Sequence, residues 1–317
     1  MVAAPSSPAS EDALLALGHA LRDAGYRFTT VTPDTHARVN KRPENAEARS
    51  LADVFGWSRP FRPELLPPPM RGIMETAGVL VRDGARCRSA VRVSSLDGEL
   101  FFHSAFPTTA ADSVFFGPDT YRFAAAIRSA LRMRDRPVRR AVDIGCGAGP
   151  GAIVAAKARA GAEVFMVDIN EAALRLARIN ARLAGAANVE ACRSDLLKHI
   201  DGRFDLIVAN PPYLVDPAQR AYRHGGGPLG AGLSLAILDT ALERLSPGGT
   251  LVLYTGAAVL NGADPFRAAA ADRLSRSAAR WTYREMDPDV FGEELEAEAY
   301  RNVDRIAAVV LTVEQDG

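Results

Sequence analysis

The chain has 317 residues, enough for one large domain or two of ordinary size. Hydrophobic residues make up 48% and charged residues 24%, a balance that excludes a disordered chain and is ordinary for a globular enzyme. Basic and acidic residues each number 38, so the zero net charge argues against binding to nucleic acid through bulk charge. There are only three cysteines, no long apolar run and no signal peptide, so we expect a cytoplasmic protein without a membrane span.

The N-terminal end predicts a tail followed by a helix. Residues 1–10 are rich in proline, serine and alanine, and we expect this segment to be disordered. Ser10 precedes an amphipathic stretch that stops at Gly25, which predicts a helix capped by the serine hydroxyl.

Residues 78–106 predict a different local structure. Two runs rich in β-forming residues are interrupted at Asp83-Gly84 and Asp97-Gly98, and such pairs favour hairpin turns. We therefore assign residues 11–110 to a small α+β module, a helix plus a β-meander in one antiparallel sheet, that recognises the substrate.

Strand and helix patterns alternate along residues 111–317. The expected strands are 139–145, 162–168, 188–192, 204–210, 249–256, 280–286 and 304–313, and the expected helices are 150–160, 171–184, 231–245 and 264–279. This alternation predicts an α/β domain with a doubly wound, Rossmann-like parallel sheet. The last two strands have no helix between them, so we expect one of them to be an antiparallel edge strand.

The first strand runs into a glycine-rich turn. Asp143 ends the strand, and glycines in the turn allow a ligand to approach the main chain closely. Pro150 suits the first turn of the following helix. Starting at Gly147, the same residues also fit the dinucleotide pattern G-x-G-x-x-A, which ends at Ala152.

Carboxylates follow the next two strands. Asp168 stands where an acid can accept hydrogen bonds from both hydroxyls of a ribose. Asp195 stands where a carboxylate can accept from the amino group of an adenine. Either aspartate could instead cap the helix that follows it.

The fourth loop is Asn210-Pro211-Pro212-Tyr213. Two prolines in succession fix the backbone and stop the strand. The carbonyl oxygens of the Asn210 side chain and of Pro211 can together accept both hydrogens of an –NH2 group. The ring of Tyr213 can stack on a flat amide or base.

These four loops, in this order, resemble those of the class I S-adenosylmethionine-dependent methyltransferases. The motifs are "DIGCGAGPG", "VDIN", "RSDLL" and "NPPY", and the tetrapeptide is typical of the branch that methylates amino groups. The set is most similar to the HemK/PrmC type of protein-glutamine N5-methyltransferase. The segment 114–127 resembles the lead-in of that family, although Gly-Pro-Asp-Thr-Tyr replaces its usual Pro-Arg-Pro-Glu-Thr-Glu.

The resemblance implies S-adenosylmethionine as cofactor and roles for particular residues. Cofactor contacts are implied for Asp143, Gly145, Cys146, Gly147, Gly149, Asp168, Ile169, Asp195, Leu196 and Asn210. Catalytic roles are implied for Asn210, Pro211, Pro212 and Tyr213, and the lead-in residues are Phe116, Pro118 and Thr120. We expect no metal.

The acceptor stays open at this point. Protein glutamine is our first hypothesis, and a base in RNA (guanine N2 or adenine N6) is the alternative, favoured by the N-terminal module and by seven arginines in residues 122–140. A small-molecule acceptor is a third hypothesis. An NAD-dependent oxidoreductase would explain the glycines and Asp168 but gives no role to Asn210–Tyr213.

Overall fold

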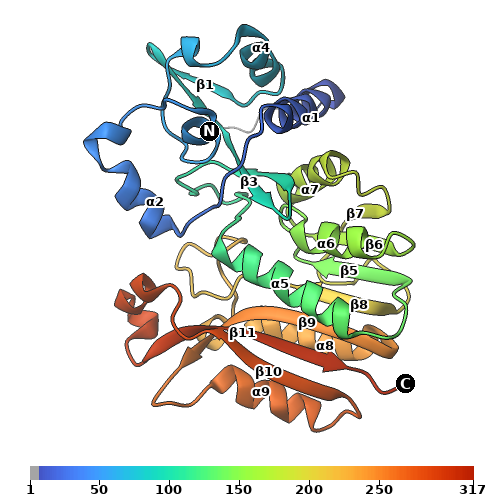
Figure 1. The fold of residues 1–317 in the computed structure, drawn as a ribbon. Coiled ribbons are helices and arrows are strands. Elements are labelled where there is room, and N and C mark those ends of the chain that lie inside the picture. Colours follow the sequence, from blue (N-terminus) through green and yellow to red (C-terminus); the bar gives the residue numbers. More distant parts are fainter. Residues whose placement is uncertain (1–6) are drawn as a thin grey trace.

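The computed structural model describes residues 7–317 and shows a small N-terminal module above a larger sheet domain (Figure 1). The module contains α1 (Pro8–Asp23), α2 (Pro33–Asn40), α3 (Leu51–Phe55), α4 (Pro68–Thr76), β1 (Leu80–Asp83), β2 (Arg86–Ser89), β3 (Val91–Leu96) and β4 (Glu99–Ser104). The sheet domain contains α5 (Pro118–Met133), β5 (Arg140–Ile144), α6 (Pro150–Ala158), β6 (Glu163–Asp168), α7 (Glu171–Leu183), β7 (Val189–Arg193), β8 (Phe204–Ala209), α8 (Gly232–Arg244), β9 (Leu245–Val259), α9 (Pro265–Leu274), β10 (Arg280–Asp287) and β11 (Arg305–Glu314).

The large sheet has seven strands in the order β10-β11-β9-β8-β5-β6-β7. Its central strands are largely apolar, because helices cover both faces. Ala141 of β5 packs in the hydrophobic cluster with α5, α6 and α7, whereas its neighbour Val142 packs in the cluster with α8 and α9. The predicted doubly wound α/β fold is therefore confirmed.

The end of the sheet differs from the expectation. The antiparallel strand is β11, and it lies between β9 and β10 instead of at the edge. Residues 306–311 of β11 are buried without a break, so this strand needs a neighbour on each side. Every second residue at the start of β10 is exposed, which suits an edge.

The first helix begins earlier than expected. Residues 1–6, part of the predicted disordered tail, lie outside the described residues, but Pro8, Ala9 and Ser10 belong to α1. The N-cap is Ser7, whose hydroxyl accepts from the Ser10 N–H at 3.2 Å. The Ser10 hydroxyl in turn accepts from the Ser7 N–H at 3.2 Å. Pro8 at the first helical position makes this earlier start favourable.

Both predicted hairpin turns are present, but the strands do not form one meander. The β1–β2 and β3–β4 hairpins are separate two-stranded sheets. They part at Ala90, whose N–H bonds to the Val79 carbonyl. Both hairpins lie against α3; the first also packs on α4, and the second also packs on α1 and α7.

Asn180 joins the module to the sheet domain. This fully buried side chain on α7 accepts from the Phe102 N–H of β4 at 2.8 Å and donates to the Phe102 carbonyl at 3.0 Å. It also donates to the Ala148 carbonyl in the glycine-rich turn at 2.9 Å. The hydrophobic cluster on this face is continuous across the predicted division at residue 110.

A buried polar cluster lies inside the module. The His36 ring bonds to the Trp57 carbonyl at 2.9 Å and stacks on Phe106, and its other nitrogen lies 3.5 Å from the Arg92 guanidinium. Burial and the positive charge of Arg92 lower the pKa of His36 to about 4. His103 is buried beside the same arginine, and its pKa also lies well below the ordinary value.

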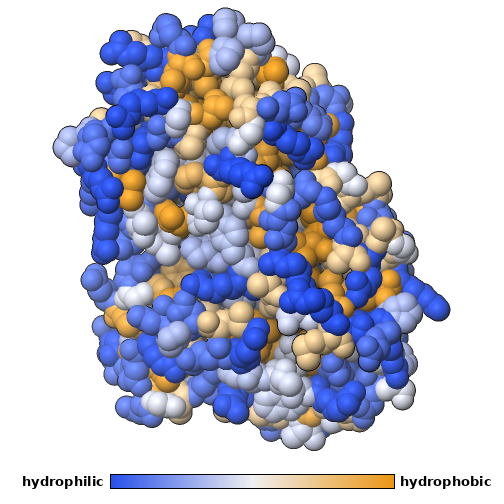
Figure 2. Space-filling model, in the orientation of Figure 1, coloured by the Kyte–Doolittle hydropathy of each residue, from blue (hydrophilic) through white to orange (hydrophobic). Residues whose placement is uncertain are grey.

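The outer surface mixes polar and apolar side chains, as Figure 2 shows for one face. In residues 7–317, no helix combines the length and the apolar character needed to cross a membrane.

The His36 site predicts that acid destabilises the protein. The unfolded chain takes up a proton near pH 6.5, whereas the folded site resists protonation until about pH 4. The contribution of His36 to the unfolding free energy is therefore fully present above pH 6.5, and it is lost as the pH falls from 6.5 to about 4. Urea unfolding from pH 4 to 8 measures the slope. His36→Gln should reduce it, and the exposed His19→Gln should not; equal slopes in all three proteins would contradict the assignment.

The Asn180 bonds predict a large loss of stability in Asn180→Ala. The substitution leaves three backbone groups without their partner, so we expect unfolding free energy to fall by about 2–4 kcal/mol. Denaturation in urea checks this. Arg182 lies on the same helix as Asn180 and forms an exposed ion pair with Asp12 of α1. Arg182→Ala should change the unfolding free energy by less than about 1 kcal/mol. Equal losses of unfolding free energy in the two variants would show that the Asn180 hydrogen bonds stabilise the protein no more than an exposed ion pair.

Candidate functional site

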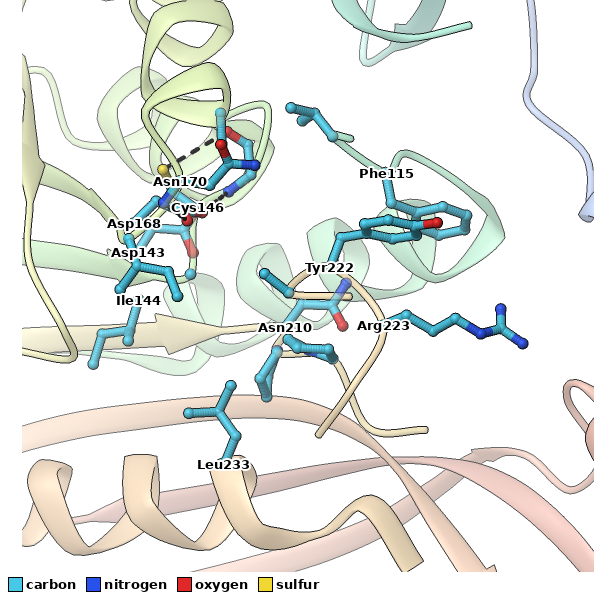
Figure 3. A pocket seen from close by; sticks show the side chains of 18 of the residues that line it. Phe115, Asp143, Ile144, Cys146, Asp168, Asn170, Asn210, Tyr222, Arg223 and Leu233 are labelled. Atoms are coloured by element: carbon cyan, nitrogen blue, oxygen red, sulfur yellow. Dashed lines mark hydrogen bonds between the residues drawn. The ribbon is translucent and has the colours of Figure 1, made fainter. Parts of the chain in front are cut away.

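A cavity of about 210 Å³ opens at the carboxyl ends of β5, β6 and β8 (Figure 3). Parallel strands bring their ends to one edge of a sheet, so residues from distant parts of the chain meet here. Residues of all four predicted loops line the cavity: Asp143, Ile144, Gly145, Cys146, Gly147, Ala148 and Pro150; Asp168, Ile169 and Asn170; Ser194, Asp195 and Leu196; and Asn210, Pro211, Pro212 and Tyr213.

Asp143 is a buried carboxylate at the end of β5. One oxygen accepts from the Ala152 N–H at 2.9 Å, and the other is buried without a partner in the described chain. Burial raises the pKa of Asp143 to about 7. An unpaired buried oxygen in a cavity wall needs a donor, and an ammonium group on a ligand would supply one.

The glycine-rich turn leaves space for a ligand. Gly147 has a φ of +54°, and a side chain added there would meet no other atom of the protein. Gly151, which the sequence prediction omitted, is needed for packing, because a Cβ there would lie 2.6 Å from the Asp143 carboxylate. Gly149 does not line the cavity; a Cβ added there would lie 3.0 Å from the Met166 sulfur and 3.2 Å from the Ala177 Cβ.

Asp168 closes the turn from the next strand. Its oxygens accept from the Gly147 N–H and the Asn170 N–H, both at 2.9 Å. Burial raises its pKa. Carboxylate oxygens have further acceptor capacity, so Asp168 can still take hydroxyl donors from a ligand.

Two residues at the cavity entrance are open to solvent. Ile169 is 54% exposed, an unusual position for a large apolar side chain, and it would cover one face of a flat ligand. Asp195 pairs with Lys198 at the surface, while its neighbour Leu196 adopts a φ of +51°.

Residues 210–213, here called the Asn210 corner, lie between two groups of side chains. Figure 3 shows Asn210 with Asp143, Asp168 and Cys146 on one side and with Phe115 and Tyr222 on the other. Within residues 7–317 the Asn210 carboxamide makes no hydrogen bond, so its oxygen is free to accept from a ligand. Tyr213 is only 6% exposed, and its ring packs edge-on against Phe291.

The lead-in segment contributes less than expected. Thr120 lines the cavity, but Phe116 and Pro118 do not. Phe116 is fully buried and stacks on His103 in the module, so its neighbour Phe115 takes the place at the cavity.

Several lining residues were missed by sequence reasoning: Phe115, Asp119, Tyr222, Arg223 and Phe291. Asp119 is visible in the lead-in as the acid after Gly-Pro, but only Phe116, Pro118 and Thr120 are predicted as site residues from this segment. The other four lie in irregular segments whose path depends on tertiary packing.

The arrangement combines a polar end and an aromatic end. The polar end offers carboxylates and backbone groups, and the aromatic end presents Asn210 beside apolar walls. Across residues 7–317, no group of three or more histidine, cysteine or acidic residues is placed to hold a metal. Such a cavity suits a polar cofactor that meets a flat acceptor at Asn210.

Comparison with known proteins agrees with this arrangement. Residues 124–259 match the family model "Methyltransferase small domain". The release factor glutamine methyltransferase of Deinococcus radiodurans is 33% identical over 220 residues, 65% of this chain and 74% of that protein.

Two further comparisons extend the range of similar proteins. The 4-amino-L-phenylalanine/4-methylamino-L-phenylalanine methyltransferase of Streptomyces pristinaespiralis is 32% identical over 53% of this chain, and the match spans 58% of that enzyme. A SAM-dependent methyltransferase structure from Agrobacterium tumefaciens is similar with a TM-score of 0.49, 20% identity and 80% coverage of each chain.

The alternative of an NAD-dependent oxidoreductase is thereby overturned, since the family model and the relatives are methyltransferases. The cofactor is S-adenosylmethionine. The chain belongs to the class I S-adenosylmethionine-dependent methyltransferases of the HemK/PrmC type.

Proposed function

We propose that the acceptor is a planar nitrogen, and specifically the side-chain amide of a glutamine in a protein. The observation that carries this proposal is the free Asn210 carboxamide at the junction of the polar and aromatic ends of the cavity. Relatives named release factor glutamine methyltransferase support the glutamine, including one of 39% identity over 150 residues from Mycobacterium leprae.

We assign the polar end of the cavity to the cofactor. The unpaired Asp143 oxygen would accept from its ammonium group, and the glycine turn would lie against its amino-acid part. Asp168 would accept from the ribose hydroxyls, and Asp195, with Ile169 and Leu196 beside it, would border the adenine. Such a group fits the acceptor oxygens of the cavity wall. It also fits the space left by the glycines, which have no Cβ atom.

The chemistry then follows from positioning. When bound, the cofactor supplies an electrophilic methyl group on a sulfonium. The Asn210 side-chain oxygen and the Pro211 carbonyl would accept the two hydrogens of the acceptor NH2, which directs the nitrogen lone pair toward that methyl. Methyl transfer would form a nitrogen–carbon bond as the carbon–sulfur bond breaks, leaving a thioether, and the nitrogen would then lose one proton to water. Phe115, Tyr222 and Phe291 would keep water away from the acceptor.

A small aromatic amine is the second candidate acceptor. The Streptomyces relative is named for methylation of 4-amino-L-phenylalanine, and aromatic side chains surround Asn210 here.

The structure weakens one argument for an RNA base as the acceptor. Four of the seven arginines in residues 122–140 bond to other groups of the protein. Arg122, Arg128 and Arg140 form ion pairs with carboxylates, and Arg134 donates to the Gly248 carbonyl at 2.8 Å.

Transfer of a labelled methyl group from the cofactor to protein, RNA and small-molecule fractions of a cell extract tests the acceptor. The proposal expects label in protein, released as N5-methylglutamine after enzymatic digestion. Label in RNA alone, or in small molecules alone, would reject it.

Asp143 predicts that cofactor affinity depends on pH. Because its pKa is about 7 in the free protein, the carboxylate needed for the ammonium contact is increasingly protonated below that pH. Affinity should therefore fall as pH decreases from 7 and level off above it. Asp143→Asn should bind about 10- to 100-fold more weakly and lose this slope. Calorimetric titration from pH 5.5 to 8.5 measures both, with the exposed Asp195→Asn as a control that keeps the slope. A flat wild-type profile would refute the assignment.

Asn210→Ala should separate catalysis from cofactor binding. Removal of an acceptor that orients the nucleophile should lower kcat about 100-fold or more, while the cofactor Kd changes by less than about threefold, which is below 1 kcal/mol. Single-turnover methylation and calorimetry provide the two values. Parallel losses in both measurements would mean that Asn210 supports the cofactor site instead.

A further inference from the structure

Asp119 is a buried carboxylate in the cavity wall to which the mechanism above gives no role. It lies in the first turn of α5 and is 5% exposed. One oxygen accepts from the Tyr213 hydroxyl at 2.5 Å, and the other accepts from the Tyr254 hydroxyl at 2.6 Å and from Arg122 at 3.2 Å. With these donors in place, the carboxylate is arranged to hold neighbours rather than to take a proton from an acceptor.

Tyr213, the main partner of Asp119, is enclosed on its other sides. A Cβ on Gly256 would lie 2.2 Å from the tyrosine ring, and a Cβ on Gly230 would lie 2.1 Å from the Tyr213 carbonyl oxygen. Only glycine therefore fits at positions 230 and 256. The hydrogen bond from the Tyr213 hydroxyl to Asp119 then fixes the orientation of the Tyr213 ring.

The position of Tyr213 is transmitted to Asn210 by a short, stiff connection. Pro211 and Pro212 separate the two residues, and each proline ring fixes its own φ angle. The residue before each proline is restricted to extended backbone as well. A shift of the tyrosine anchor therefore moves the corner as a unit, including the Asn210 carboxamide and the Pro211 carbonyl.

Asp119 is also held by Tyr254 of the sheet and by Arg122 of α5. Tyr254 lies on β9 and is fully buried, and Arg122 forms a second ion pair with Asp287 at the end of β10. The carboxylate thus connects α5, the Asn210 corner and two strands of the sheet. Burial and the adjacent Asp119 raise the pKa of Tyr213 well above its ordinary value, so this tyrosine remains a hydrogen-bond donor.

We propose that Asp119 is a positioning residue for the acceptor: through the Tyr213 hydroxyl it fixes the Asn210 corner at the place where the acceptor nitrogen binds. This inference rests on the proposed function, because the corner matters only if the acceptor binds there. It predicts an effect on acceptor binding and turnover that leaves cofactor binding unchanged.

A bisubstrate analogue provides the test. In this probe the nitrogen of a glutamine-like carboxamide is joined through a short linker to the 5′ carbon of adenosine, and S-adenosylhomocysteine serves as the cofactor-only ligand. We expect Asp119→Asn and Tyr213→Phe each to weaken the analogue about tenfold, one hydrogen bond to a charged group. Both should bind S-adenosylhomocysteine within about threefold of wild type.

Two further variants show whether the effect passes through Tyr213. The double variant Asp119→Asn/Tyr213→Phe should lose no more affinity than either single variant, because both remove the same bond. Tyr254→Phe removes a bond of the same kind from the other carboxylate oxygen and should keep the affinity within about threefold. Additive losses, or equal losses in Tyr254→Phe, would overturn the proposal.

A measurement that does not depend on the acceptor completes the experiment. The side-chain amide resonance of Asn210, assigned with Asn210→Asp, should shift or broaden in Asp119→Asn and in Tyr213→Phe but not in Tyr254→Phe. An unchanged resonance in Asp119→Asn would overturn the positioning role. If wild-type protein binds the analogue no better than S-adenosylhomocysteine, the glutamine acceptor is rejected, and this resonance alone decides the role of Asp119.

Discussion

Parallel pairing of β5 with β6 and β8 is the constraint on which the site depends. Three strands that run in one direction end at one edge, so Asp143, Asp168 and Asn210 meet although many residues separate them along the chain. The strands are largely apolar because helices cover both faces, and the polar groups of the cavity lie at the strand ends and in the loops that follow. The same pairing thus produces both the buried core and the polar rim of the cavity.

Local pattern was sufficient to predict the sheet domain and the four loops that line the cavity. Apolar runs broken by glycine and proline mark β5, β6 and β8 within a few residues, and the loops after them are the loops that line the cavity. Prediction succeeded there because each strand is buried on both faces and each loop carries its own turn residues. The glycine, aspartate and Asn-Pro-Pro-Tyr signals are contained in single short segments.

The failures concern partners that are distant in the sequence. The pattern of β11 shows that the strand is buried, but its place between β9 and β10 depends on which strand is more tolerant of an edge. The turns of both small hairpins were predictable, whereas their separation depends on the helices beneath them. Asp119 was visible as an acid in the lead-in, but its importance comes from two tyrosines in later segments.

The Asn180 side chain has a consequence for how such a protein could diversify. One carboxamide satisfies the backbone of β4 in the module and the carbonyl of Ala148 in the cofactor turn. A chimera that exchanged the module for another would therefore need a replacement strand with a matching pair of backbone groups facing α7. Exchange of the module is thus limited to modules that preserve this docking geometry, although the loops that follow β5, β6, β7 and β8 lie entirely within the sheet domain.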